Sequence, residues 1–228
     1  MPAHLGEHTW PELANGVAPL LAVPIGSCEQ HGPHLPLDTD TRIASALAAE
    51  LTAAFEPGRI LIAPPIAVSA SGEHAGFPGT LSLGTDVMAT LLIELARSAD
   101  WAAGIVLVNG HGGNAEPVRR AVATLTSEGR NVLAWWPQLR GADAHAGITE
   151  TSLMLTIAPE LVRMDDAAAG RTEPIADLID ELRHSGVKPV SPNGVLGDPM
   201  GATADHGRAV LGHLVADLVA VVDTWWIR

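Results

Sequence analysis

Short apolar segments alternate with longer helical patterns along most of this chain, and this alternation restricts the fold more than any other feature. The clearest apolar segment is 104–108, whose sequence GIVLV is typical of a strand buried on both faces of a parallel sheet. Strands that alternate with helices predict an α/β fold with a mainly parallel sheet and helices on both of its faces. The predicted strands are 20–25, 59–63, 104–108 and 131–135, and the predicted helices are 41–55, 85–99, 115–128, 148–157, 173–184 and 203–224.

The length and composition favour one globular unit. A chain of 228 residues suits an α/β domain with a substantial core, so we predict a single domain over 1–228. Hydrophobic residues make up 47% of the chain and charged residues 17%, a composition that argues against disorder. Segment 186–201 is rich in turn-forming residues, and its length indicates a cover over an active site rather than a linker.

The charge balance excludes several classes of partner. The formal net charge is -13, and Lys188 is the only lysine. Proteins that bind nucleic acid need Lys and Arg to neutralise phosphates, and proteins that bind anionic membranes also need basic residues. The first residues lack the basic region and apolar run of a signal peptide, and no apolar stretch has the length of a membrane span. The single cysteine, Cys28, excludes an internal disulfide. We therefore expect a soluble cytoplasmic protein that binds neither nucleic acid nor membranes.

The strongest indication of function follows the first predicted strand. Glu29 and His31 are two residues apart, so their side chains point to the same side of an extended backbone. Asp40 comes nine residues after His31 in the same loop and is expected to close on them. A carboxylate, an imidazole and a second carboxylate suit Zn²⁺, Mn²⁺ or Fe²⁺. This motif therefore indicates a metal-dependent enzyme.

A second motif, NGHGGN, directly follows the apolar segment 104–108. Ligands of open α/β sheets collect at the carboxyl ends of strands, so His111 is expected to lie at such a site. Gly112 and Gly113 would let the backbone pass close to a metal or a substrate. The alternative interpretation is a glycine-rich turn with a capping histidine. Phosphate binding is excluded, because the motif has neither the dinucleotide-binding glycine spacing nor the Lys-Ser/Thr of a P-loop.

The third motif contains His145 and Glu150. His145 lies in a loop of small residues and suits general acid–base catalysis, because the pKa of histidine is close to the working pH. Glu150 opens a predicted helix. It is either a ligand that completes a second metal site or an acidic first-turn residue that the helix dipole favours.

Another Glu-His pair, Glu73 and His74, lies in the glycine-rich segment 71–80. Adjacent residues diverge on a strand, so we interpret this segment as a pocket wall, with Glu73 or His74 as a metal ligand the less favoured alternative. His34 lies between two prolines, and we expect it to orient its loop rather than bind metal.

Taken in order, the segments EQHGPHLPLDTD, NGHGGN and HAGITETS resemble the motifs of the creatininase (creatinine amidohydrolase) family. The resemblance extends over about 20–222. It implies a three-layer α/β/α sandwich with a mainly parallel central sheet, and a metal centre that cleaves C–N bonds of cyclic or linear amides. It further implies two divalent metal ions per subunit as cofactors, either Fe²⁺ or Zn²⁺, with Mn²⁺ as an alternative. It also implies a homo-oligomer, most often a hexamer.

The same resemblance assigns roles to individual residues. Glu29, His31, Asp40 and His111 match the family's metal ligands, with Asp40 as the bridge, and His145 matches its catalytic histidine.

Two departures from creatininase itself affect the expected chemistry. Creatininase has an acidic metal ligand at the position of Gly113 and a glutamate at the position of Ala144. These differences argue against creatinine as the substrate and leave the second metal site one ligand short. Glu150 is the best local substitute for that ligand.

Further segments, among them LPLDTDTRIA and VSPNGVLGDPMGATADHGR, resemble a peptidase branch of the family. That branch implies a modified precursor peptide as the substrate, from which a modified C-terminal Val-Tyr dipeptide is removed. Two other functions remain open. One is a small-molecule amidohydrolase that acts on a lactam or a formamide, and the other is a non-catalytic, metal-stabilised binding protein in a biosynthetic complex.

Overall fold

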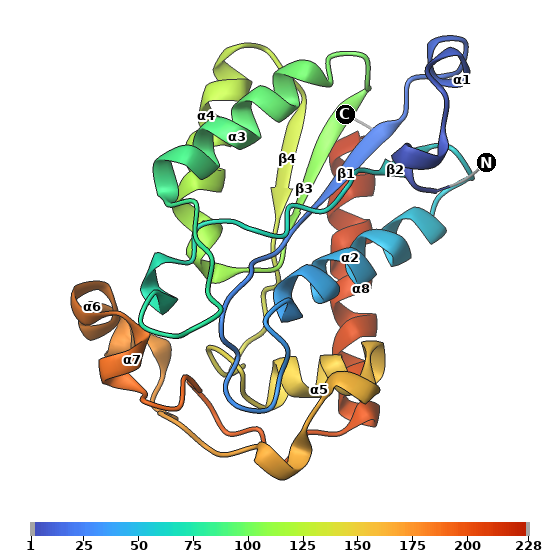
Figure 1. Ribbon diagram of the computed structural model, residues 1–228. Helices are drawn as coiled ribbons and strands as arrows, with labels where there is room; N and C mark the ends of the chain where they lie inside the picture. The colour runs from blue at the N-terminus through green and yellow to red at the C-terminus, as the bar shows by residue number, and fades with distance from the viewer. Residues whose placement is uncertain (1–2, 227–228) are drawn as a thin grey trace.

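A parallel four-stranded sheet forms the centre of the protein, whose computed structural model describes residues 3–226 (Figure 1). The strand order is β2-β1-β3-β4, and all three neighbouring pairs are parallel. The two middle strands, which are the longest, consist entirely of buried residues, as expected for strands covered on both faces. The strands are β1 (Leu20–Ile25), β2 (Ile60–Ile62), β3 (Gly104–Asn109) and β4 (Val132–Trp135).

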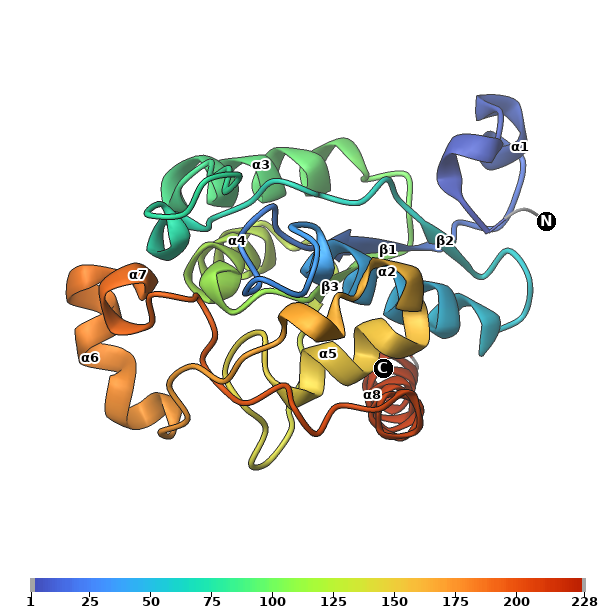
Figure 2. The same cartoon turned by 60° about the horizontal axis from the view of Figure 1, so that its bottom comes forward.

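Helices cover both faces of this sheet, which confirms the predicted α/β/α sandwich. Alternate residues of β1 enter two separate cores: Leu20 and Ala22 belong to one cluster of buried side chains, and Leu21 and Val23 belong to the other. In Figure 2 the two helical layers lie on opposite sides of the strands. The first core is covered by α2 (Thr39–Ala53), α5 (Ile148–Ile157) and α8 (Ala204–Trp226), and the second by α3 (Thr85–Ser98) and α4 (Ala115–Ser127).

Helix α8 has the length and hydropathy of a membrane-spanning segment, yet it packs as a core helix along one side. Leu214, Leu218 and Val222 are fully or almost fully buried against the first core. Asp217 and Asp223 lie on the outward side, and Asp217 accepts a 2.7 Å hydrogen bond from the indole N–H of Trp135. The helix is therefore amphipathic, which suits the surface of a globular protein.

A small cluster outside the two main cores holds α6 (Ile175–Ser185) and α7 (Val187–Val190) beside the 3₁₀ turn η2 (Gly72–His74). Leu178, Leu182, Val187, Val190 and Leu196 are buried there, with Phe77 packed against them. Figure 1 shows both helices at one end of the molecule, away from the sheet. The predicted loop 186–201 therefore begins with a short helix, and its later residues return to the centre of the protein.

The predicted elements agree with the structure to within about two residues, with a few exceptions. Helix α2 begins at Thr39, two residues before the predicted start, with Asp38 as its N-cap, so Asp40 lies in the first turn of the helix. Short elements were not predicted, because they carry too few residues for a periodic pattern. They are α1 (Trp10–Ala14), α7 and the 3₁₀ turns η1 (Leu5–Glu7), η2, η3 (Gly112–Asn114), η4 (Pro159–Leu161) and η5 (Met164–Asp166).

Candidate metal centre

The loops that follow β1 and β3 bring the predicted metal ligands together at the carboxyl ends of these strands. Glu29 and His31 follow β1, Asp40 lies in the first turn of α2, and His111 follows β3. Adjacent parallel strands end at the same edge of the sheet, which is where ligands of open α/β sheets bind. All four side chains are 5% exposed or less. The site is therefore a buried centre of two carboxylates and two imidazoles.

Asp40 contacts both histidines of this centre. One of its carboxylate oxygens, Oδ1, is 3.1 Å from Nε2 of His31, and the other, Oδ2, is 3.1 Å from Nδ1 of His111. The Ser27 hydroxyl donates a 2.8 Å hydrogen bond to Oδ2 and so holds the carboxylate in place. Glu29 closes the group, with Oε2 3.2 Å from Nε2 of His111. This arrangement suits the predicted bridging role of Asp40.

The charges of the centre are strongly coupled. Burial raises the pKa of Glu29 to about 7, and the negative charge of Asp40 adds to this against the opposing effect of the histidines. Burial alone would lower the pKa of His31 and His111, but the nearby carboxylates outweigh it and raise these values to about 9 and about 10. The same histidines hold the pKa of Asp40 well below its usual range despite its burial. The centre therefore holds positive charge tightly, whether as protons or as a metal cation.

The carboxylate of Glu29 shows that the residues present fit a cation. Both of its oxygens are buried, and their contacts with ring nitrogens of His111 and His74, at 3.2 and 3.3 Å, do not have hydrogen-bond geometry. A buried carboxylate without a well-formed hydrogen bond is costly unless a cation faces it. Ligand atoms of Glu29, His31 and Asp40 all lie within 4.8 Å of one another. Imidazole and carboxylate ligands in this number suit Zn²⁺, Fe²⁺ or Mn²⁺.

His145 and Glu150 lie beside the same centre. Nδ1 of His145 is 3.9 Å from Oε1 of Glu29 and 4.0 Å from Oε2 of Glu150. Ligand atoms of His31, His145 and Glu150 lie within 4.8 Å of one another and form a second group of metal-ligand type. Burial raises the pKa of Glu150 to about 7, against a lowering by His31. Glu150 thus faces the centre, and its carboxylate lies where it could supply the ligand that the second metal site lacks.

The backbone next to His145 is held in an uncommon conformation. Ala146 has a φ of 54°, in the left-handed region that residues other than glycine seldom adopt. Its N–H donates a 2.6 Å hydrogen bond to the Glu150 carboxylate. The His145 N–H and C=O pair with Leu196 of the segment 186–201 at 3.1 and 2.9 Å. The predicted cover therefore forms part of the wall that fixes His145.

The sequence favoured a pocket wall for Glu73 and His74 over a role as ligands, and the structure places both side chains at the centre. Nε2 of His74 is 3.3 Å from Oε1 of Glu29, and its ring lies 4.5 Å from that of His145. Burial, with help from His111, lowers the pKa of His74 to about 3. Glu73 contacts a different residue of the centre, with Oε1 3.5 Å from Nε2 of His111. The two residues lie in the 3₁₀ turn η2, not in a strand, and a Glu-His pair in a glycine-rich loop was the available signal.

The glycine at position 113 is explained by this neighbourhood. A Cβ atom added to Gly113 would lie 2.1 Å from Oε1 of Glu73 and 2.4 Å from Nε2 of His111. The space next to Gly113 is therefore already filled by a carboxylate from another loop. Nε2 of His34 is 2.9 Å from the Thr151 hydroxyl, a contact that connects its loop to α5.

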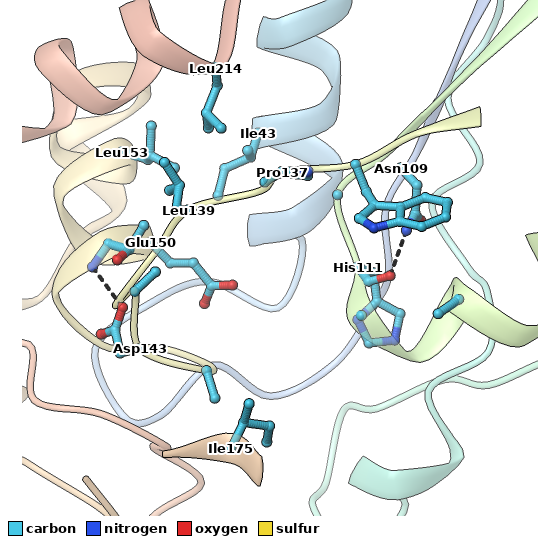
Figure 3. A pocket seen from close by; sticks show the side chains of 17 residues that line it. Ile43, Asn109, His111, Pro137, Leu139, Asp143, Glu150, Leu153, Ile175 and Leu214 are labelled. Carbon is cyan, nitrogen blue, oxygen red and sulfur yellow. Dashed lines mark hydrogen bonds between the residues drawn. The ribbon is translucent and has the colours of Figure 1, made fainter. Parts of the chain in front are cut away.

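A cavity of about 360 Å³ opens beside the centre (Figure 3). His111, Asp143 and Glu150 line its polar side. The rest of its wall is mostly apolar and includes Trp136, Pro137, Leu139, Leu153 and Ile175. An apolar cavity with a few polar groups at one side is the usual form of a small-ligand or side-chain pocket.

The α/β/α sandwich and the buried centre define an α/β protein with the donor set of a metallohydrolase. The family model described as creatinine amidohydrolase matches residues 6–222. This chain belongs to the creatininase family.

Relatives and solved structures agree with this assignment. The mycofactocin precursor peptide peptidase of Mycolicibacterium smegmatis is 47% identical over 98% of this chain and 92% of its own length, and that of Mycobacterium ulcerans is 50% identical over 91% and 86%. The creatinine amidohydrolase of Pseudomonas putida is 32% identical over 71% of this chain and 74% of its own. A solved structure of the manganese form of creatininase superposes with a TM-score of 0.80 at 25% identity, over 99% of both chains. The protein is thus an enzyme that hydrolyses amide bonds.

Proposed function

We propose that this enzyme is the peptidase that acts on the mycofactocin precursor peptide and releases its modified C-terminal Val-Tyr dipeptide. The identity of about half of all residues to peptidases of that name, over nearly the whole of both chains, is the observation that carries this proposal. The glycine at position 113 and the alanine at position 144 support it, because creatininase itself has acidic residues there.

The metal ligands proposed are Glu29, His31, Asp40 and His111, with Asp40 as the bridge and Glu150 completing a second site. We propose two divalent ions per subunit, of Fe²⁺ or Zn²⁺, with Mn²⁺ as an alternative. Such ions supply Lewis acidity to an amide carbonyl and make water a nucleophile near neutral pH. The remaining chemistry belongs to the side chains of the protein.

His145 is the proposed general acid and base. Burial lowers its pKa well below the usual value, which keeps the ring neutral in the resting protein. In the proposed reaction it takes a proton from the attacking water as the new C–O bond forms. It then gives that proton to the amide nitrogen as the C–N bond breaks, which forms a free amine and a carboxylic acid, and the acid loses its remaining proton to solvent.

The apolar cavity is the proposed binding site for the side chains of the released dipeptide. Its volume of about 360 Å³ and its wall of Trp136, Leu139 and Ile175 suit an aliphatic or aromatic group beside a polar cleavage point.

We also infer that the chain works as one domain, assembles as a homo-oligomer of six subunits, and acts in the cytoplasm. Light scattering after size-exclusion chromatography tests the subunit number.

A small-molecule amidohydrolase is the second candidate function. It is favoured by the 32% identity to a creatinine amidohydrolase and by a cavity at the small end of the range for ligand sites. A lactam or a formamide would then replace the peptide. The third candidate, a non-catalytic binding protein, predicts retained peptide binding without turnover.

Mass spectrometry of reaction products distinguishes these functions. The purified protein is loaded with Fe²⁺, Zn²⁺ or Mn²⁺ in turn and incubated with the modified precursor peptide. Release of the modified Val-Tyr dipeptide supports the peptidase and identifies the most effective metal. A metal-loaded protein that leaves the peptide intact but cleaves lactams or formamides would overturn the proposal in favour of the second candidate.

A further inference from the structure

Gln30 lies between Glu29 and His31 in the chain, and its buried side chain connects several loops of the centre. It is 6% exposed. Its Oε1 accepts a 2.9 Å hydrogen bond from the N–H of Gly32, and its Nε2 donates a 3.0 Å hydrogen bond to the carbonyl of Gly194. A backbone N–H can only donate and a carbonyl can only accept. These two contacts therefore fix which end of the amide is oxygen and which is nitrogen.

The main chain of Gln30 fixes the proton on His145. Nε2 of His145 is 2.8 Å from the Gln30 carbonyl oxygen, which can only accept, so this nitrogen carries the hydrogen. In a neutral imidazole the other nitrogen then holds a lone pair. That nitrogen, Nδ1, is the one 3.9 Å from Glu29 and 4.0 Å from Glu150. The basic side of His145 therefore faces the metal centre.

The side chain of Gln30 fixes the proton on His74. The amide has two hydrogens, and one is used by the Gly194 carbonyl. Two ring nitrogens lie near enough to receive the other: Nδ1 of His74 at 2.9 Å and Nε2 of His145 at 3.0 Å. Because Nε2 of His145 is itself a donor, the hydrogen goes to His74. Nε2 of His74 then carries its own hydrogen, and this nitrogen lies 3.3 Å from Oε1 of Glu29.

We propose that Gln30 is a positioning residue that sets the tautomers of two histidines, so that His145 presents a lone pair and His74 presents an N–H to the centre. This proposal rests on the proposed role of His145 as general base. The main-chain carbonyl holds the hydrogen of His145, and the side-chain amide holds that of His74. Without the amide, only the His74 hydrogen would be free to move. His74 could then turn a lone pair toward the Glu29 carboxylate, which would be repulsive.

The loop at Gly194 is shaped to reach this amide. Gly194 has a φ of +83°, which favours glycine, and a Cβ atom there would lie only 1.8 Å from Oε1 of Gln30. Gly32, the other partner of the amide, has a φ of +67°. The backbone on both sides of Gln30 thus depends on glycine to approach it closely.

The first test measures the tautomers directly in the unaltered, zinc-loaded protein. Nitrogen NMR of protein labelled at the histidine rings separates protonated from unprotonated ring nitrogens. We expect hydrogen on Nε2 of His145 and on Nε2 of His74, with Nδ1 unprotonated in both rings. Hydrogen on Nδ1 of either ring would overturn the proposal. This readout does not depend on the substrate, so it stands apart from any failure of the proposed peptidase activity.

The second test exchanges the donor for an acceptor. Gln30→Glu keeps the shape and the contact to Gly32 but removes both hydrogens, so we expect His74 to move its hydrogen to Nδ1. Gln138→Glu makes the same charge change at an exposed position and serves as the control. With metal content unchanged, we expect Gln30→Glu to lower kcat roughly 10–100-fold through the changed His74, with KM within about twofold. Unchanged tautomers and kcat would contradict the proposal, and if the variant fails to fold the spectrum of the unaltered protein still decides.

Discussion

The Asp40 carboxylate lies between His31 and His111, with one oxygen 3.1 Å from Nε2 of the first ring and the other 3.1 Å from Nδ1 of the second. This relationship joins a ligand from the loop after β1 to one from the loop after β3. The side chain that makes it comes from the first turn of α2. The geometry of the centre therefore depends on the packing of α2 against the sheet as much as on the two histidines.

Asp40→Asn is expected to remove most of the metal and nearly all turnover. The substitution keeps the size of the side chain but takes away the charge that both histidines and a shared cation would face. We expect metal affinity to fall by more than about 100-fold, because even changes outside the ligand set cost 10–100-fold. Inductively coupled plasma mass spectrometry of the purified protein measures this. Asp38→Asn is the matched control, since Asp38 pairs with Arg42 at the surface, and full metal content in Asp40→Asn would contradict the assignment.

The stability of the metal-free protein is expected to fall as the pH rises from about 7 to about 10. Asp40 and Glu29 raise the folded-state pKa of His31 to about 9 and of His111 to about 10, against the lowering effect of burial. A histidine whose pKa is higher in the folded state binds more protons there, so its contribution is complete below about pH 6.5 and is lost as the pH passes its folded pKa.

Metal loading should remove or reverse this pH dependence, because the ion displaces these protons and its affinity grows as they leave. Thermal unfolding followed between pH 6 and 10, with EDTA or with Zn²⁺, measures both curves. A metal-free protein whose melting temperature rises over this range would show that the histidines are not held in their charged form.

Much of the fold and part of the site could be predicted from the sequence. The strands and long helices follow from periodic patterns of apolar residues, and Glu29, His31 and His111 follow from their spacing after strands. His74 was missed because its direction depends on the 3₁₀ turn η2, which brings it against Glu29. The contacts of Gln30 depend on loops from four separate parts of the chain. Such contacts between distant segments leave no local pattern in a single sequence.

Glu73→Gln is expected to weaken metal binding at His111. The Glu73 carboxylate lies 3.5 Å from Nε2 of His111 and adds negative charge beside a ligand that Glu29 and Asp40 also contact. A carboxylate next to a metal-ligating histidine raises its basicity, and loss of such a partner costs roughly 10–100-fold in metal affinity. Competition with a chelator measures the affinity. Glu56→Gln, at an exposed position, controls for the change in net charge, and equal affinities for both variants would argue against a role for Glu73.

Trp136→Ala is expected to impair substrate binding more than the chemical step. Trp136 lines the cavity beside the centre, and its removal takes away apolar wall without touching the carboxylates or histidines. We expect KM to rise roughly tenfold, which corresponds to about 1.4 kcal/mol of lost contact, with kcat within about threefold. Steady-state kinetics with the precursor peptide measures both constants. Trp101→Ala removes an indole that is 41% exposed and outside this cavity; a similar KM change there would show that the effect is not local.

Gly26→Ala is expected to destabilise the protein and loosen the metal centre together. A Cβ atom on Gly26 would lie 2.3 Å from Cα and 2.4 Å from N of Thr41, the residue after Asp40. Because backbone cannot move aside as easily as a side chain, the first turn of α2 would have to shift, at a cost of roughly 3 kcal/mol. Gly212→Ala is the control, because Gly212 lies in α8 with no atom near the added Cβ, and alanine there should stabilise by up to about 1 kcal/mol. Denaturant unfolding together with metal analysis tests both effects, and a Gly26→Ala protein with full stability and metal content would show that α2 can move without disturbing Asp40.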